Sequence, residues 1–158
     1  MFITQVCEKL EDSKIGYMVV GGFAVALHGA VRGTLDLDLV ISLDEKSFIK
    51  AETVLLKLGL QPRLPVTAKE IFHFRKDYIE NRNLIAWSFY SPTQKADQLD
   101  IIITHDFQKM KYVIYEVAGT KIKVASIKDL IAMKNISKRP QDLEDIKALQ
   151  EILKNEKK

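Results

Sequence analysis

Cysteine, tryptophan and proline are scarce in this chain, whose 158 residues include one Cys, one Trp and four Pro. A single cysteine excludes an internal disulfide. Cys7 shares the apolar stripe of an expected first helix with Ile3, Val6 and Leu10. We therefore expect Cys7 to be a reduced thiol in the core of a cytoplasmic protein.

Long apolar runs and known ligand-binding spacings are also missing. No apolar stretch approaches the ~18 residues of a membrane span, and no charged-then-apolar leader opens the chain. We expect no membrane partner and no signal peptide. No Cys and His spacing suggests zinc, and no P-loop motif is present. With 47% hydrophobic residues and no linker, residues 1–158 are expected to form a single domain.

The net charge of +3 is modest, and the basic excess lies in the C-terminal third. These lysines can attract a triphosphate or an RNA backbone by long-range steering. A solvated face is the simpler interpretation for most of them.

A pair of glycines interrupts the apolar pattern near the N-terminus. Tyr17 to Val20 form an apolar run that stops at Gly21 and Gly22, and residues 24–27 then favour a helix. The glycines are therefore predicted at a strand-to-helix turn. The unpaired amides of a first helical turn can hold an anion there, because no side chain blocks its approach.

Two carboxylates follow on what reads as one strand. Asp36 and Asp38 alternate with leucines, which places both carboxylates on one face. Two like charges held this close repel each other, and a divalent cation with oxygen ligands is the usual offset. A third carboxylate, Asp100, heads the apolar run 101–103 on a later predicted strand.

These motifs resemble the signature of the DNA polymerase beta-like nucleotidyltransferase superfamily, most closely its AbiEii-like and small antibiotic-modifying branches. The matching residues are Gly21-Gly22, the run Arg32-Gly-Thr-Leu-Asp-Leu-Asp-Leu39, Asp100, and the segments 124–134 and 139–145. The resemblance covers most of residues 17–153. It implies that Gly21 and Gly22 bind a nucleoside triphosphate, and that Asp36, Asp38 and Asp100 are the catalytic carboxylates and bind Mg²⁺.

The resemblance also assigns the nucleotide side. Arg32 and Thr34 match the pattern before the first aspartate, and Lys134 matches a lysine near the nucleotide. From the residues alone, Arg32 either contacts phosphate or pairs with Asp36 or Asp38. Lys134 falls on an apolar helical stripe, so its ammonium either reaches out to solvent or binds an anion. Asp142 and Asp145 are expected only to complement the dipole of the last helix.

The order of predicted elements indicates an α/β or α+β fold, with a mixed sheet flanked by helices and a C-terminal helical pair within residues 126–154. Ser42 to Glu45 and Ser126 to Asp129 each read as a capping box, and Gly59 and Pro140 as a helix stop and a helix start. The expected helices are 2–13, 22–31, a segment ending at 58, and 67–76. The expected strands are 17–20, 35–41, 60–64, 84–90, 98–103, 111–117 and 120–125.

The chemistry implied is transfer of a nucleoside monophosphate to an acceptor hydroxyl. The acceptor is left open between tRNA, protein and a small molecule, and a cognate toxin or antitoxin is a further expected partner. The alternative is a nucleotide-binding antitoxin or regulatory module of the same fold. Two departures bear on this choice: many members have Gly-Ser where this chain has Gly21-Gly22, and AbiEii-like toxins are usually longer.

Overall fold

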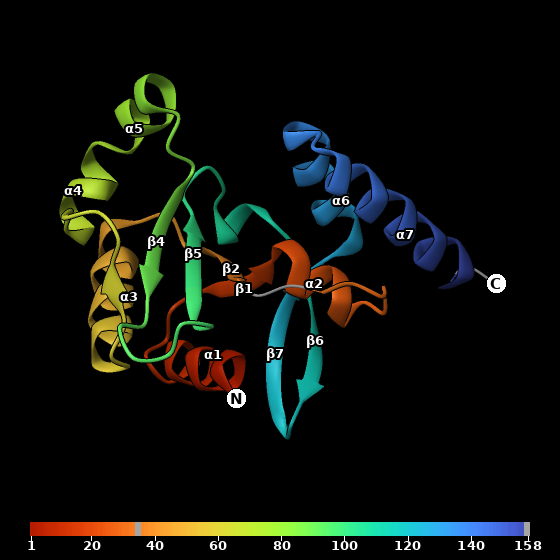
Figure 1. The fold of residues 1–158 in the computed structure, drawn as a ribbon, viewed down its shortest axis with the longest axis horizontal. Helices are drawn as coiled ribbons and strands as arrows, with labels where there is room; N and C mark the ends of the chain where they lie inside the picture. The colour runs from red at the N-terminus through yellow and green to blue at the C-terminus, as the bar shows by residue number, and fades with distance from the viewer. Residues whose placement is uncertain (34–35, 157–158) are drawn as a thin grey trace.

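The structure is a computed structural model and describes residues 1–33 and 36–156. A seven-stranded sheet in the order β3-β4-β5-β2-β1-β7-β6 forms its centre. Figure 1 shows the pair α6 and α7 at one end of the molecule and α4 and α5 at the other. The predicted α/β class with a mixed sheet and a C-terminal helical pair is confirmed.

The strands are β1 (Tyr17–Val20), β2 (Asp36–Ile41), β3 (Gln61–Pro62), β4 (Ala86–Tyr90), β5 (Gln98–Ile102), β6 (Tyr112–Val117) and β7 (Thr120–Ala125). The helices are α1 (Phe2–Asp12), α2 (Gly21–Leu27), α3 (Glu45–Lys57), α4 (Ala68–His73), α5 (Arg75–Arg82), α6 (Ile127–Ser137) and α7 (Pro140–Glu156), with a short 3₁₀ turn η1 at Phe107–Lys109.

The middle of the sheet is buried on both faces. β1 is antiparallel to β2 and parallel to β7, and β2 is parallel to β5. All four residues of β1 are buried, as are Leu37 and Leu39 of β2. Burial on both sides explains why β1 is a continuous apolar run rather than an alternating one.

α1 places its apolar stripe in the core as predicted. Ile3, Val6, Cys7 and Leu10 are all buried. Burial raises the pKa of the Cys7 thiol to about 12, so this cysteine stays a protonated core group at neutral pH.

Several predicted boundaries are wrong for local reasons. The helix after the glycine turn ends at Leu27 rather than 31, because Gly29 takes a φ of +115° that a helix does not allow. Residues 67–76 do not form one helix, since the chain bends at Phe74 and continues as α5.

The capping predictions were partly right. α3 is capped by Asp44, which accepts a hydrogen bond from Ser47 N at 2.7 Å, whereas Ser42 is buried at the end of β2. Ser126 caps α6 by accepting from Asp129 N. The Asp129 carboxylate does not close the box, because it accepts from Lys111 N at 2.7 Å instead. Among the described residues, no helix has both the length and the apolar character needed to cross a membrane.

Candidate active site

The glycine turn lies where β1 ends and α2 begins, as predicted. Gly21 has a φ of +67°, in the left-handed region that favours glycine. A Cβ at Gly21 would collide with Oδ2 of Asp38. Glycine is therefore required here both by the backbone and by the carboxylate beside it. Gly22 is buried in the first turn of α2.

We expect Gly21→Ala to be more destabilising than Gly119→Ala. Both glycines have positive φ, so alanine at either site carries a conformational cost of about 1–2 kcal/mol. Only at Gly21 does the new methyl also meet Asp38, since nothing lies within 4 Å of the corresponding position at Gly119. Overpacking of this kind adds about 1–3 kcal/mol. Urea unfolding of both variants measures the difference, and equal losses would show that the Gly21–Asp38 contact is unimportant.

The carboxylates of Asp38 and Asp100 come from neighbouring parallel strands. Asp38 of β2 pairs in register with Asp100 of β5, and Val20 lies opposite Asp38 on its other side. Asp36 is two residues earlier on β2, in register with Gln98. The structure thus brings two of the three predicted catalytic residues side by side, next to the glycine turn, and places the third on the adjoining exposed end of β2.

The carboxyl group of Asp38 has a strongly raised pKa. Burial raises its pKa to about 7, aided by the negative charges of Asp100 and Asp36 and by a hydrogen bond with Asp100, while the charge of Lys134 opposes the shift. Near neutral pH this cluster therefore holds a proton, or it needs a cation in the proton's place.

The donor set fits a hard divalent cation, which prefers carboxylate oxygens. Within residues 1–33 and 36–156, however, no three Asp, Glu, His or Cys groups are already gathered into a metal-binding arrangement. Asp38 and Asp100 supply two neighbouring carboxylates. A metal site made by all three carboxylates therefore requires their side chains to come closer together.

Lys134 lies in a buried ionic network. The sequence left open whether its ammonium reaches solvent or binds an anion, and in the structure it contacts two carboxylates. Its side chain is only 8% exposed, and its Nζ is 2.8 Å from Oδ2 of Asp145 and 3.4 Å from Oδ1 of Asp142. Arg32 Nε binds the same Asp145 at 2.9 Å and 3.1 Å, and this pairing replaces the one considered with Asp36 or Asp38. The anions that Lys134 binds in the structure are therefore the carboxylates of Asp142 and Asp145.

Asp142 and Asp145 do more than complement the dipole of α7, so the role predicted for them was incomplete. Burial works to raise the pKa of Asp142, but hydrogen bonds from Ser137 and Arg139 and the charge of Lys134 outweigh it and lower this pKa to about 2. The pKa of Asp145 is lowered as well, because hydrogen bonds from Lys134, Gln141 and Arg32 outweigh its burial. Both carboxylates are therefore ionised at neutral pH.

The sequence did contain a signal for this network. Asp142, Asp145, Ile146 and Leu149 recur at i, i+3, i+4 and i+7, and all four are buried on one stripe of α7. Carboxylates that share a buried stripe require a cation opposite them, and Lys134 on the facing helix α6 provides it.

We expect the Asp142 carboxylate to stabilise the fold above about pH 4 and to lose this effect as the pH falls toward 2. The reason is that its folded pKa of about 2 lies below its ordinary value of 3.8. Asp142→Asn should lower the free energy of unfolding at pH 7 and flatten its fall between pH 4 and 2. Asp12→Asn, at an exposed position of α1, is the control. Parallel pH profiles for the wild type and Asp142→Asn would contradict this assignment.

Two residues of this region remain, Thr34, which was predicted on the nucleotide side, and His28, which directly follows α2. Thr34 lies outside the described residues. His28 has a structural environment, as its Nε2 is 2.8 Å from the carbonyl oxygen of Ala125 and its Nδ1 is 2.8 Å from the Tyr115 hydroxyl.

A cleft of ≈ 480 Å³ adjoins Asp38 and Gly21 and reaches α6 and the start of α7. Thr104 and His105, which follow β5, also line it, and sequence reasoning missed both because neither belongs to a recognisable spacing. Their side chains are joined by a 2.8 Å hydrogen bond between Thr104 Oγ1 and His105 Nδ1. Burial lowers the pKa of His105, which favours the neutral imidazole.

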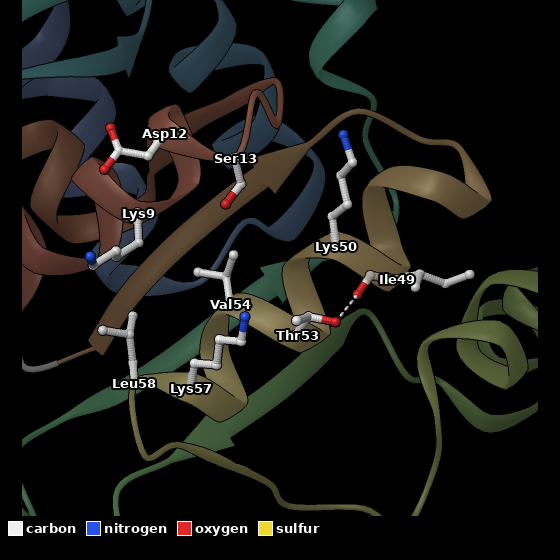
Figure 2. A pocket seen from close by; sticks show the side chains of 9 residues that line it. All are labelled: Lys9, Asp12, Ser13, Ile49, Lys50, Thr53, Val54, Lys57 and Leu58. Carbon is white, nitrogen blue, oxygen red and sulfur yellow. Dashed lines mark hydrogen bonds between the residues drawn. The ribbon is translucent and has the colours of Figure 1, made fainter.

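A second hollow, of ≈ 680 Å³, lies between α1 and α3 and contains none of the predicted site residues. Figure 2 shows Lys9, Lys50 and Lys57 among its lining side chains, together with apolar groups and the hydrogen bond from Thr53 to the Ile49 carbonyl. Although it is larger, it lacks the carboxylate pair and the glycine turn, so the candidate site is the cleft at Asp38.

Comparison with solved structures supports the nucleotidyltransferase fold. An antigenic nucleotidyltransferase-like protein from Paracoccidioides brasiliensis is 21% identical, covering 93% of this chain and 73% of its own with a TM-score of 0.60. The lincosamide antibiotic adenylyltransferase LnuA, in a lincomycin-bound structure, is 17% identical over 95% of both chains, with a TM-score of 0.61. ANT(2″)-Ia in complex with adenylyl-2″-tobramycin is 14% identical, covering 98% of this chain and 89% of its own, with a TM-score of 0.61.

These structural similarities show the class of fold, an α/β nucleotidyltransferase-like architecture, and not a particular activity. No family model matches the chain. No curated protein matches it either.

Proposed function

We propose that this chain is a metal-dependent nucleotidyltransferase, which moves a nucleoside monophosphate from a nucleoside triphosphate to an acceptor hydroxyl. The observation that carries the proposal is the in-register pair Asp38 and Asp100, held against the Gly21 turn. Holding two repelling, partly buried carboxylates side by side, next to a glycine that has no room for a side chain, is unfavourable without a cation, and a bound cation offsets that cost.

Asp38 and Asp100, with Asp36 turned toward them, would hold Mg²⁺. When bound, the ion neutralises charge on the triphosphate oxygens and on the departing pyrophosphate. Asp100 either completes this ligand set or accepts the proton of the attacking hydroxyl. The bond from the acceptor oxygen to the α-phosphorus forms as the bond from the α-phosphorus to the bridging oxygen breaks, and pyrophosphate leaves.

On the nucleotide side, the backbone amides of Gly21 and Gly22 would face the phosphates. The family resemblance implies that Thr34 also contacts the nucleotide. Lys134 and Arg32 supply positive charge there, but Asp145 already binds both of them. We therefore propose that Lys134 acts mainly through its field at Asp38, whose pKa it lowers. Arg32 would connect the residues before β2 to α7.

The solved structures support this reaction class through their own names. LnuA is an adenylyltransferase crystallised with lincomycin, and ANT(2″)-Ia was crystallised with an adenylylated tobramycin. A small-molecule acceptor is accordingly the first to test for this chain. Transfer to tRNA or to protein, including a toxin or antitoxin partner, follows from the sequence resemblance.

The test is transfer of label from four α-³²P-labelled nucleoside triphosphates with Mg²⁺. Separate reactions contain lincomycin, tobramycin, total tRNA or a cell protein extract. We expect label on one acceptor class, lost on adding EDTA. Nucleotide binding without transfer to any class would instead favour the binding module of the same fold, and no binding at all would contradict both.

A further inference from the structure

The lining of the cleft at Asp38 is strongly apolar. Aliphatic side chains come from β1, the segment before β4, β5 and α6, and they are Val20, Ile85, Ile102, Leu130, Met133 and Ile136. Phosphates and a metal ion do not need aliphatic contacts, so this part of the lining is suited to an apolar group of a ligand. Its volume of ≈ 480 Å³ is in the range of sites that take one drug-sized molecule.

Two isoleucines of this lining are exposed to solvent. Ile85 is 54% exposed and Ile136 is 73% exposed, and both line the cleft. They come from segments far apart in the sequence, before β4 and near the end of α6. Exposed apolar groups beside a catalytic cluster indicate a surface that a ligand covers.

The charges of the cleft balance. Its lining contains the carboxylates of Asp38 and Asp142 and the cations of Lys134 and Arg139. Asp142 is already engaged by Lys134 and Arg139 at 3.4 Å and 3.2 Å. Asp38 is assigned to the metal in the proposed function. No carboxylate of this lining is left to attract a polycationic molecule.

Most polar side chains of the lining already bind one another, since Lys134, Ser137 and Arg139 all contact Asp142. Thr104 and His105 hold each other by a hydrogen bond through Nδ1 of the imidazole. In the described part of the chain, no hydrogen bond is made by the other ring nitrogen, which can therefore bind a ligand hydroxyl. A small number of available polar atoms beside aliphatic side chains matches an amphiphilic molecule.

We propose that the cleft binds the acceptor, and that the acceptor is a hydroxylated small molecule with an aliphatic portion and little or no positive charge. That the bound molecule is an acceptor rests on the proposed function. Binding of such a molecule in the cleft does not require catalysis. Its hydroxyl end would lie toward Asp38 and His105, and its aliphatic part against Ile85, Ile102 and Ile136.

The test uses isoleucine δ1-methyl NMR of the full chain without nucleotide or metal. The probe is hexyl β-D-glucoside, which is uncharged and carries both hydroxyls and an alkyl chain, and kanamycin is the polycationic comparison. We expect saturable shifts of the Ile85, Ile102 and Ile136 methyls with the glucoside, and none with kanamycin. Ile49, in the hollow of Figure 2, should not move.

Ile136→Glu should weaken glucoside binding at least tenfold. Ile114→Glu is the matched control, because Ile114 is 55% exposed on β6 and does not line the cleft. Ile85→Glu repeats the test from the other wall, should the α6 variant fail to fold. Equal binding by wild type and both cleft variants, tighter binding of kanamycin, or shifts of these methyls by ATP instead of the glucoside would overturn the proposal.

This design separates the two proposals. Glucoside binding in the cleft with no label transfer to any acceptor would contradict the enzyme and leave the binding site standing. Transfer to tobramycin, without glucoside binding, would support the enzyme and overturn the acceptor class.

Discussion

Asp38→Asn and Asp100→Asn should each lower Mg²⁺-dependent transfer by about a thousandfold or more, since metal-held charge stabilisation contributes several kcal/mol to such a transition state. An amide has the shape of the carboxyl group but not its charge, so the fold should persist. Asp12→Asn, exposed and remote, should retain full activity. Initial rates of label transfer measure the effect.

The same variants should be more stable than the wild type in the absence of metal. The folded pKa of Asp38 is about 7, well above its ordinary value of 3.8, so ionising it in the folded protein is unfavourable. The resulting loss of stability grows as the pH rises from about 4 to 7. Asp38→Asn removes this loss, so its Tm advantage should increase over that range. A lower Tm for both variants at pH 8 would show that these carboxylates hold the fold and would contradict the metal site.

Lys134→Met should lower the free energy of unfolding by about 3 kcal/mol, the low end of the range for a broken buried ion pair, because Arg32 and Arg139 still contact the two carboxylates. Here two carboxylates, Asp142 at 2% and Asp145 at 3% exposure, would lose their shared cation. Lys128→Met, exposed on the same helix, should cost little. Urea unfolding at pH 7 measures both.

A rescue experiment identifies the cause. Adding Asp142→Asn to Lys134→Met removes the buried carboxylate whose other cation, Arg139, is exposed, while Asp145 keeps its pairing with Arg32. The double variant should therefore recover part of the lost stability. No recovery would show that Lys134 acts through packing of its aliphatic stem and not through its charge.

Local chemistry was sufficient to predict the central part of the site. The alternation of Asp36 and Asp38 with leucines placed both carboxylates on one strand, and the apolar run before Gly21 placed the turn. Both signals are written in adjacent residues, so no tertiary contact is needed to see them. The pairing of Asp38 with Asp100 depends on sheet order, and the sequence reached it through the family resemblance.

The parts that sequence reasoning missed depend on contacts between distant segments. Arg32 and Asp145 are far apart in the chain, and nothing near Arg32 indicates that α7 will supply its partner. The break at Phe74 and the capping of α3 by Asp44 are similar cases, where several neighbouring residues had suitable chemistry and packing chose among them.

The cleft was the least predictable feature. Its aliphatic lining comes from separate elements, each of which looks like ordinary core in sequence. The high exposure of Ile85 and Ile136 distinguishes these two residues from the core, and exposure can be seen only in the folded chain.

The central claim is that the carboxylates beside the Gly21 turn direct transfer of a nucleoside monophosphate. The most direct measurement compares α-³²P-ATP with γ-³²P-ATP, or the preferred nucleoside triphosphate in the same two forms, with wild type and Asp100→Asn. The account predicts that α-label reaches the acceptor while γ-label appears only in pyrophosphate. With Asp100→Asn, neither labelled acceptor nor labelled pyrophosphate should form. Transfer of γ-label to the acceptor, or equal α-label transfer by Asp100→Asn, would contradict it.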